Sequence, residues 1–285
     1  MRVHPLLRSC FVWAGLRRPV QVVLREGRLP WEAQDLRALP DREARLTQRI
    51  EQLTAQGLAL DVAPIGRLVL IRMADRRHVL FYGCHHVLTD GWSLGIILSE
   101  VFAAYRAARE GRELRALPAS TYESYLRWME RQPREAADSF WQRAMAGFEA
   151  PTPLALEDRV PAGAREQRTY ERTLDADFTA KLKAVAEAQR VTPRTVCDGA
   201  WALLLSHCSG RSDVLFGSFV SGREMDVPGI EGLVGLFIRV LPIRARIDEQ
   251  QSAWAWLRAL QEAQAEAREH QHVSLAEIQQ HTAVP

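Results

Sequence analysis

The sequence predicts an α/β protein of the α+β sandwich type, built from two lobes that each mix strands and helices. The chain has 285 residues, 47% hydrophobic and 25% charged, which is enough for one large domain or two smaller lobes with cores. Apolar runs typical of strands and amphipathic runs typical of helices occur in both halves. A stretch of proline, small and charged residues at 150–168 separates the halves. We therefore predict lobes at 1–155 and 156–285.

Composition excludes several classes of protein. The net charge is only +2, from 37 basic and 35 acidic residues, which argues against a dedicated nucleic-acid binder. No apolar run approaches the length that spans a bilayer, so no membrane contact is predicted. The four cysteines are scattered without Cys-x-x-Cys spacing, which indicates a reduced, cytoplasmic setting without a disulfide framework or zinc knuckle. They are Cys10, Cys84, Cys197 and Cys208.

In the first half, residues 20–24 predict a short strand and residues 41–56 a charged helix. Two apolar runs, 68–73 and 78–83, are separated by a short polar segment, the layout of a β-hairpin. The next helix, 94–105, has apolar residues at i, i+3, i+4, i+7 and i+11, which predict a buried stripe. That stripe consists of Leu94, Ile97, Leu98, Val101 and Tyr105.

Later elements are predicted by their own local signals. Helical patterning covers 134–148, a strand-like run covers 168–174, and a helix covers 177–189. Strands are expected at 213–220 and 236–247. Capping residues mark two more helices: Thr192 with Pro193 begins one that runs to residue 209, and Ser252 begins the last. Pro242 indicates an edge or a bulge in its strand.

The segment 85–93 carries the densest chemistry. It reads as a strand end, a polar turn and a helix start, a place where folds often present reactive side chains. Adjacent side chains on a strand point to opposite faces, so only one of His85 and His86 can face a given cavity. This disfavours the alternative of a zinc or iron site built from the histidines and Asp90. Gly91 is expected at a backbone angle that a β-carbon would penalise.

This segment resembles the His-His-x-x-x-Asp-Gly-Trp-Ser signature of the condensation domains of nonribosomal peptide synthetases, which belong to the chloramphenicol-acetyltransferase-like superfamily. Further motifs of that family are similar in order and spacing, at 4–11, 122–128, 220–223, 234–244 and 268–279. The sequence departs from the family pattern at Ser124, where aspartate is usual, and at Arg239 and Val240, where Asn-Thr is usual.

The resemblance implies two chloramphenicol-acetyltransferase-like lobes in a V-shaped pseudo-dimer with the active site at their interface. It also implies that the family's opening strand and helix precede residue 1, and that part of the second lobe follows residue 285. We therefore expect this chain to be an internal piece of a condensation domain.

The reaction implied is amide formation between a donor thioester and an acceptor amine. Both substrates would be carried on 4'-phosphopantetheine arms of upstream and downstream carrier proteins, beside an adenylation domain, with no cofactor or metal bound directly. His86 is the implied catalytic residue, either abstracting a proton or positioning the amine. The backbone N–H of Gly91 is implied to lie near the thioester carbonyl.

Other residues are implied to support the site. His85 is expected to be structural. Asp90 is expected to pair with Arg223 from the second lobe and so hold the active-site loop. Trp92 is expected to pack in the core, and Arg8 to form a salt bridge that stabilises a lobe.

Two other functions stay open. One is another enzyme of the superfamily, either an epimerisation domain or a stand-alone acyltransferase. Epimerisation domains usually continue after Asp-Gly with Val-Ser-Trp, so Trp92 and Ser93 favour condensation. The other is an inactive remnant that only docks carrier proteins.

Overall fold

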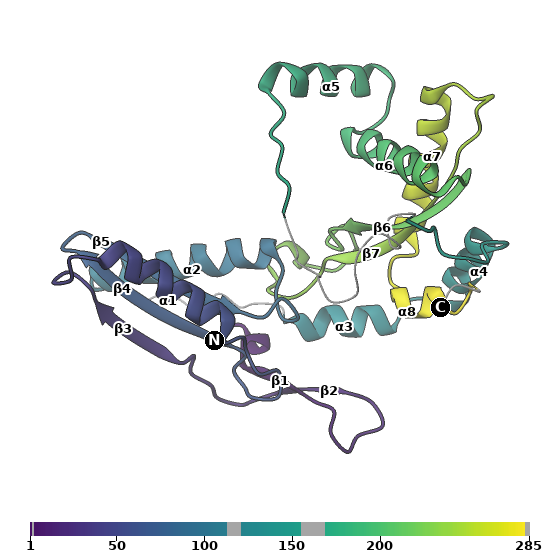
Figure 1. Cartoon of the computed structure of the whole chain (residues 1–285). Helices are drawn as coiled ribbons and strands as arrows, with labels where there is room; N and C mark the ends of the chain where they lie inside the picture. The colour runs from purple at the N-terminus through teal and green to yellow at the C-terminus, as the bar shows by residue number, and fades with distance from the viewer. Residues whose placement is uncertain (2, 113–120, 155–168, 283–285) are drawn as a thin grey trace, which may run out of the picture. The chain divides into compact units, whose positions relative to one another are not determined.

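The computed structural model describes residues 1, 3–112, 121–154 and 169–282 (Figure 1). The chain forms two compact units. The first comprises Met1–Glu130 and Arg223–Phe237, and the second comprises Arg131–Gly222 and Ile238–Pro285. No helix among the described residues combines the length and apolar character that crossing a bilayer requires.

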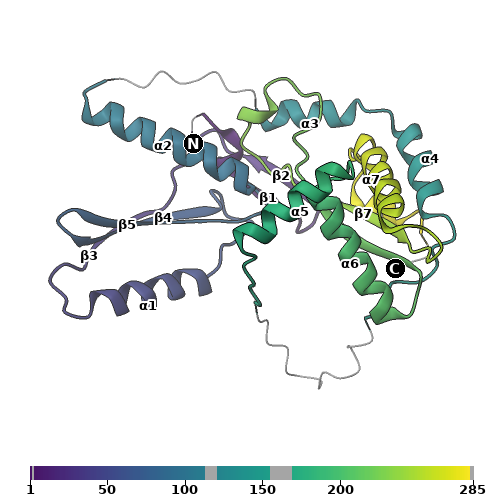
Figure 2. The ribbon, with the colours of Figure 1, turned by 90° about the horizontal axis from the view of Figure 1, so that it is seen from above.

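The first unit is organised on two small sheets. β1 and β2 pair antiparallel, and a second sheet has the order β3-β4-β5, with β3 parallel and β5 antiparallel to β4. Figure 2 places α1 and α2 on opposite sides of the second sheet. The elements are η1 (Pro5–Arg8), β1 (Ser9–Val12), β2 (Val20–Val23), β3 (Trp31–Asp35), α1 (Arg42–Ala55), β4 (Gly66–Ala74), β5 (Arg77–Cys84), α2 (Gly91–Arg109), α3 (Tyr122–Glu130) and η3 (Ile230–Gly232).

Alternation along β4 builds one face of that sheet into a core. Val69, Ile71 and Met73 are buried and pack with Leu53 of α1, as a period of two predicts for a strand covered on one side. The predicted hairpin is therefore confirmed, with β4 and β5 in register from Gly66 opposite Cys84.

The buried stripe predicted on α2 is not observed, because Ile97 and Leu98 are only half-buried and the other three residues are exposed. Leu94, Val101 and Tyr105 are 37%, 47% and 60% exposed. The only buried residues of α2 are Ser93 and Ala107. Within the described part of the first unit, the core clusters are built from α1, α3, the strands, their connecting segments and residues 223–237, and contain no α2 side chain. A period of 3.6 identifies an apolar face but not what covers it.

The second unit combines a two-stranded sheet with five helices among its described residues. β6 and β7 pair antiparallel, from Asp213 opposite Arg246 to Val220 opposite Arg239. Two core clusters join these strands to the helices, one with α5, α6 and α7 and the other with α4, α7 and α8. The elements are α4 (Arg134–Met145), α5 (Ala176–Ala188), α6 (Pro193–Ser209), β6 (Asp213–Val220), β7 (Arg239–Arg246), α7 (Ala253–Glu269) and α8 (Leu275–Gln279).

Most local signals in this unit are confirmed. The side chains of Thr192 and Ser252 cap α6 and α7, as predicted. Pro242 lies in β7, which is an edge strand of the two-stranded sheet. The strand predicted at 168–174 is not observed, since residues 169–174 are not in a strand and residue 168 lies outside the described residues. Strand-like composition alone does not supply a pairing partner.

The division into units differs from the predicted boundary at residue 155 in two segments. Helix α4 packs in the second unit, where Trp141 and Met145 share a core cluster with Leu241. Residues 223–237 belong to the first unit, where Phe237 shares a cluster with Tyr125. The composition of a sequence segment can indicate a linker, but it does not show which side chains before and after that segment pack together. Most of the predicted linker, 155–168, lies outside the described residues.

Candidate active site

The His-His motif occupies the turn between β5 and α2, rather than the strand itself. β5 ends at Cys84 and α2 begins at Gly91. The Leu88 N–H donates to the His85 carbonyl at 3.1 Å, and the Leu88 side chain, 2% exposed, anchors the turn in a core cluster. The strand alternation invoked for the two histidines therefore does not apply, because the strand has ended before them.

The two histidines nonetheless differ in environment. His85 is half-buried, and its Nδ1 accepts a hydrogen bond from the Val87 N–H at 3.1 Å. Through this bond the His85 side chain helps to shape the turn. Because Nδ1 is the acceptor, a neutral His85 imidazole carries its proton on Nε2. His86 is exposed, and its side chain makes no hydrogen bond or ion pair with any residue that the structure describes. Of the two imidazoles, that of His86 is thus the one exposed to solvent.

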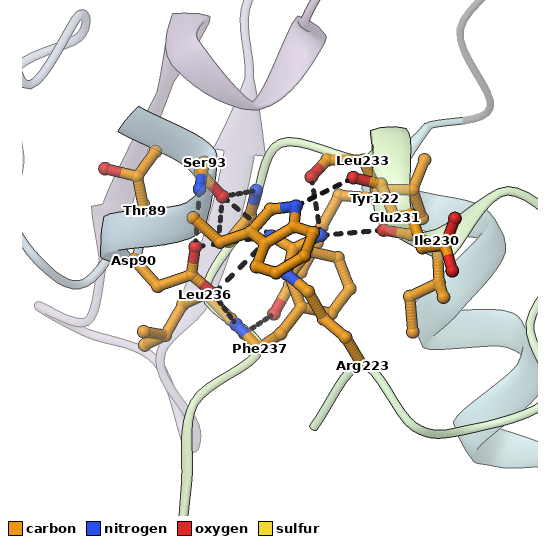
Figure 3. Close-up of polar contacts among 12 residues, drawn as sticks. Thr89, Asp90, Ser93, Tyr122, Arg223, Ile230, Glu231, Leu233, Leu236 and Phe237 are labelled. Carbon is orange, nitrogen blue, oxygen red and sulfur yellow. Dashed lines mark hydrogen bonds and ion pairs between the residues drawn. The ribbon is translucent and has the colours of Figure 1, made fainter. Parts of the chain in front are cut away.

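Asp90 fixes the end of the turn from which α2 begins (Figure 3). Its Oδ1 accepts from the Ser93 N–H at 2.8 Å, which caps the helix. Its Oδ2 accepts from the Phe237 N–H at 3.1 Å. Arg223 Nη2 lies 3.2 Å from Oδ1, and the two side chains are 4% and 2% exposed. The predicted ion pair is therefore present, but the expectation that Arg223 comes from the second lobe is wrong, because Arg223 belongs to the same first unit as Asp90.

Several groups that complete this cluster were missed by the sequence reasoning. The Ser93 hydroxyl donates to the Gly235 carbonyl at 2.7 Å and accepts from the Gly235 N–H and from Arg223, both at 3.0 Å. Arg223 Nη1 donates to the Ile230 and Leu233 carbonyls at 2.7 and 3.0 Å. Most of these partners are backbone atoms, which leave no side-chain pattern to read; Ser93 could have been found as the last residue of the signature.

Electrostatics hold Asp90 in its ionised form. Burial alone would raise the pKa of Asp90, but hydrogen bonds from Ser93 and Phe237 together with the Arg223 charge lower it below its usual value. Burial lowers the pKa of Arg223, opposed by the charge of Asp90. An arginine remains protonated in proteins regardless, so the cluster contains a charged pair at neutral pH.

Aromatic rings enclose the guanidinium of Arg223. Its Cζ lies 4.0 Å from the centre of the Phe237 ring and 5.6 Å from that of Trp92, distances at which a cation is attracted to a ring face. Trp92 is 58% exposed, so the expectation that it packs in the core is wrong. Its indole N–H donates to the Glu231 carbonyl at 2.9 Å, which holds the ring at the surface.

Gly91 does not require the special backbone angle that was expected. It is the first residue of α2 and is not among the glycines with positive φ. The position a Cβ would take is open among the described residues, with no heavy atom within 4 Å. Its N–H is one of those that helix geometry leaves without an acceptor inside the helix. An available N–H beside the His86 turn is what the structure provides here.

Arg8 lies in the first unit, where it ties the chain's start to Leu24, the residue that follows β2. Its Nε donates to the Leu24 carbonyl at 3.0 Å, and its Nη1 donates to the Met1 carbonyl. These bonds are to backbone oxygens, and the salt bridge expected of Arg8 stays a prediction. Across the described residues, no group of three or more His, Cys, Asp or Glu is placed to hold a metal ion.

Curated relatives of the chain are large synthetases. It is 48% identical over 283 residues to chondramide synthase cmdD of Chondromyces crocatus, which covers 99% of this chain and 7% of the relative. It is 39% identical over 281 residues to a linear gramicidin synthase protein of Brevibacillus parabrevis, covering 97% and 4%. The chain thus spans under a tenth of either relative.

Solved structures show the same fold. The X-domain from teicoplanin biosynthesis is 26% identical, with a TM-score of 0.77 over 100% of this chain and 64% of that one. A four-domain nonribosomal peptide synthetase bound to AMP and glycine gives a TM-score of 0.78 at 20% identity, over 99% and 21%. The α/β fold class and the resemblance read from the motifs are confirmed.

The fold and these relatives define a domain of peptide synthetases. The condensation domain model matches residues 1–285, and the chain belongs to the condensation domain family.

Proposed function

We propose that this chain contributes the His86 active site of a condensation domain, which forms an amide between a thioester donor and an amine acceptor. Both substrates would arrive on phosphopantetheine arms of carrier proteins that flank the domain, with an adenylation domain in the same synthetase. The observation that carries the proposal is the exposed, unpartnered imidazole of His86 on an anchored turn, in a chain matched by the family model from end to end.

Amide formation includes a proton transfer that an imidazole can catalyse. The acceptor nitrogen attacks the thioester carbonyl carbon, a C–N bond forms, and the tetrahedral intermediate then breaks its C–S bond to release a thiolate. The nitrogen must lose a proton, which ends on the departing sulfur. Neutral His86 can accept that proton, or hold the amine by a hydrogen bond while it attacks. Alignment of the two tethered substrates would supply much of the remaining acceleration.

The turn and the helix start supply the other requirements. The negative charge that develops on the carbonyl oxygen needs a donor, and the Gly91 N–H at the first position of α2 is free to provide one. The positive end of the α2 dipole favours the same charge. Asp90, Arg223 and Ser93 do not face substrate in this proposal, because their polar atoms bond to one another and to Gly235 and Phe237. Their task is to hold the helix start in place.

The test uses the condensation domain in its synthetase module, with donor and acceptor carrier proteins loaded with their aminoacyl groups. We expect His86→Ala to lower the rate of dipeptidyl product formation, measured by mass spectrometry, by about 100- to 10,000-fold while the far-UV circular dichroism stays unchanged. His78→Ala is the matched control, since His78 is an exposed histidine on β5 of the same unit. Near-wild-type product from His86→Ala would contradict the assignment.

The same assay separates the other enzymes of the superfamily. A change of stereochemistry in the donor without a dipeptide would indicate epimerisation. Transfer to a free amine without an acceptor carrier protein would indicate a stand-alone acyltransferase. Carrier binding with no product from the wild-type domain would indicate a docking role alone.

A further inference from the structure

A side-chain contact closes the base of the turn that carries His86. The Thr89 hydroxyl donates to the Cys84 sulfur at 3.8 Å, within the longer reach of hydrogen bonds to sulfur. Cys84 is the last residue of β5, and Thr89 precedes the residue that caps α2. The contact thus joins the two ends of the segment 85–88. Its length is consistent with a weak bond, because a thiol is a poor acceptor.

The Thr89 hydroxyl is committed to this contact rather than to the Arg223 cluster. Thr89 is 4% exposed, and in Figure 3 its side chain points away from the polar contacts around Asp90 and Arg223. On the strand side, Tyr82 is partly buried next to the same thiol. Burial raises the pKa of the Tyr82 phenol and the neighbouring Cys84 raises it further, so the phenol stays neutral there. The Cys84 thiol thus neighbours two neutral hydroxyl groups, that of buried Thr89 and that of partly buried Tyr82.

The two ends of the turn are held by different means. The helix end is fixed by the Asp90 cluster, including the bond from the Asp90 N–H to the Gly235 carbonyl at 3.2 Å. Within the turn, the bonds to the His85 carbonyl and imidazole shape the path of the chain without tying it to β5. Among the hydrogen bonds of the described side chains, the Thr89–Cys84 bond is the one that joins the end of β5 to the residues that precede α2.

From this geometry we propose that Thr89 and Cys84 are positioning residues for His86, setting its imidazole relative to the Gly91 N–H. The inference rests on the catalytic role proposed for His86. Both residues lie under the turn and act through it, so neither needs to touch the substrate. Small displacements of a catalytic group are costly, because a shift of about 1 Å can lower a rate about a hundredfold.

The experiment removes the hydroxyl while keeping the shape of the side chain. Thr89→Val in the full domain is expected to lower kcat about tenfold, with KM for the loaded carrier proteins changed less than about twofold. Thr89→Ser keeps the hydroxyl and should retain most of the rate. Thr54→Val is the matched control, since the Thr54 hydroxyl donates to the Ile50 carbonyl on α1 of the same unit. Cys84→Ala removes the acceptor instead, and serves if Thr89→Val does not fold.

A double-mutant cycle shows whether the effect passes through His86. Adding Thr89→Val to His86→Ala should change the residual rate less than about twofold, because coupled residues are not additive. An equal loss in both backgrounds would overturn the proposal, as would a loss of thermal stability in Thr89→Val with kcat unchanged.

A second readout does not depend on catalysis. The imidazole proton resonance of His86, assigned by its loss in His86→Ala, should shift or broaden in Thr89→Val and not in Thr54→Val. If His86→Ala proves fully active, the proposed function fails while this resonance still reports on positioning. An unperturbed resonance in both Thr89→Val and Cys84→Ala would overturn the positioning role itself.

Discussion

The ion pair between Asp90 and Arg223 should be the most costly single contact to break in the first unit. Both side chains are almost fully buried, so Asp90→Asn would leave a guanidinium charge without its counter-charge. Removing one partner of a buried pair typically costs about 3–5 kcal/mol. We expect that loss in the free energy of unfolding of Asp90→Asn, measured by urea denaturation at pH 7.

A second, more exposed ion pair provides the control for Asp90→Asn, and the effect of pH on stability provides a second measurement of the Asp90 contribution. Asp213 pairs with Arg244 at 2.7 Å, but its side chain is 36% exposed, so Asp213→Asn should cost about 1 kcal/mol or less. The folded-state pKa of Asp90 is lowered, so ionised Asp90 stabilises the folded protein at pH values above its unfolded pKa of about 3.9. This stabilisation is lost as the pH falls through the folded-state pKa. Asp90→Asn should lack that part of the acid destabilisation. Equal costs for the two variants would contradict the buried-pair interpretation.

At the scale of single residues, the signature motif could be recognised in the sequence, but most of the groups that contact it could not be predicted. The pairing of Asp90 with Arg223 followed from motif resemblance, since both residue types are visible in the sequence. The acceptors of Arg223 Nη1 and the donor to Asp90 at Phe237 are backbone groups, which any residue carries. Trp92 was misplaced because a tryptophan that bonds through its indole N–H can lie at the surface as easily as in a core.

Replacing a glycine with alanine should have opposite effects on stability in helices α6 and α2. A Cβ on Gly199 of α6 would overlap the Leu257 side chain of α7, whereas a Cβ on Gly95 of α2 would meet no heavy atom of the described residues within 4 Å. Gly199→Ala should therefore destabilise the protein by about 1–3 kcal/mol through overpacking. Gly95→Ala should stabilise it by up to about 1 kcal/mol through helix propensity.

Thermal unfolding of the two variants beside the wild type measures the difference. Both changes add one methyl group to a helix interior, so helix propensity alone would move the two midpoints in the same direction. A rise for Gly199→Ala equal to that for Gly95→Ala would show that α6 and α7 do not approach as closely as the structure has them.

Elements were predicted best where a local signal marks their ends. The Thr192 and Ser252 caps marked the starts of α6 and α7, and two apolar runs separated by a short polar segment marked the hairpin of β4 and β5. β3 went unpredicted because Trp31–Asp35 is mostly exposed and polar, and its strand conformation depends on parallel pairing with β4, a partner distant in sequence.

At the scale of the whole molecule, the two compact units are not continuous in sequence. Arg223–Phe237 belongs to the first unit although the residues on both sides of it belong to the second. This segment supplies Arg223, the Gly235 carbonyl and the Phe237 N–H to the Asp90 cluster, and it adds Met225, Ile230 and Phe237 to a core with Tyr125. A first lobe cut at residue 155 therefore lacks part of its own core.

A fragment of residues 1–155 should consequently fail to protect the start of α2. In that fragment Asp90 would have no counter-charge, and the Ser93 hydroxyl would lose the Gly235 acceptor. We expect the amides of residues 85–94 to exchange with solvent at rates near those of an unfolded peptide. Joining residues 223–237 to the fragment through a flexible linker should restore slow exchange. The matched control carries Arg223→Met in the joined segment and should stay unprotected, since the segment then brings its apolar residues without the charge. Slow exchange in the fragment alone, measured by mass spectrometry after hydrogen–deuterium exchange, would mean that the first unit does not depend on this segment.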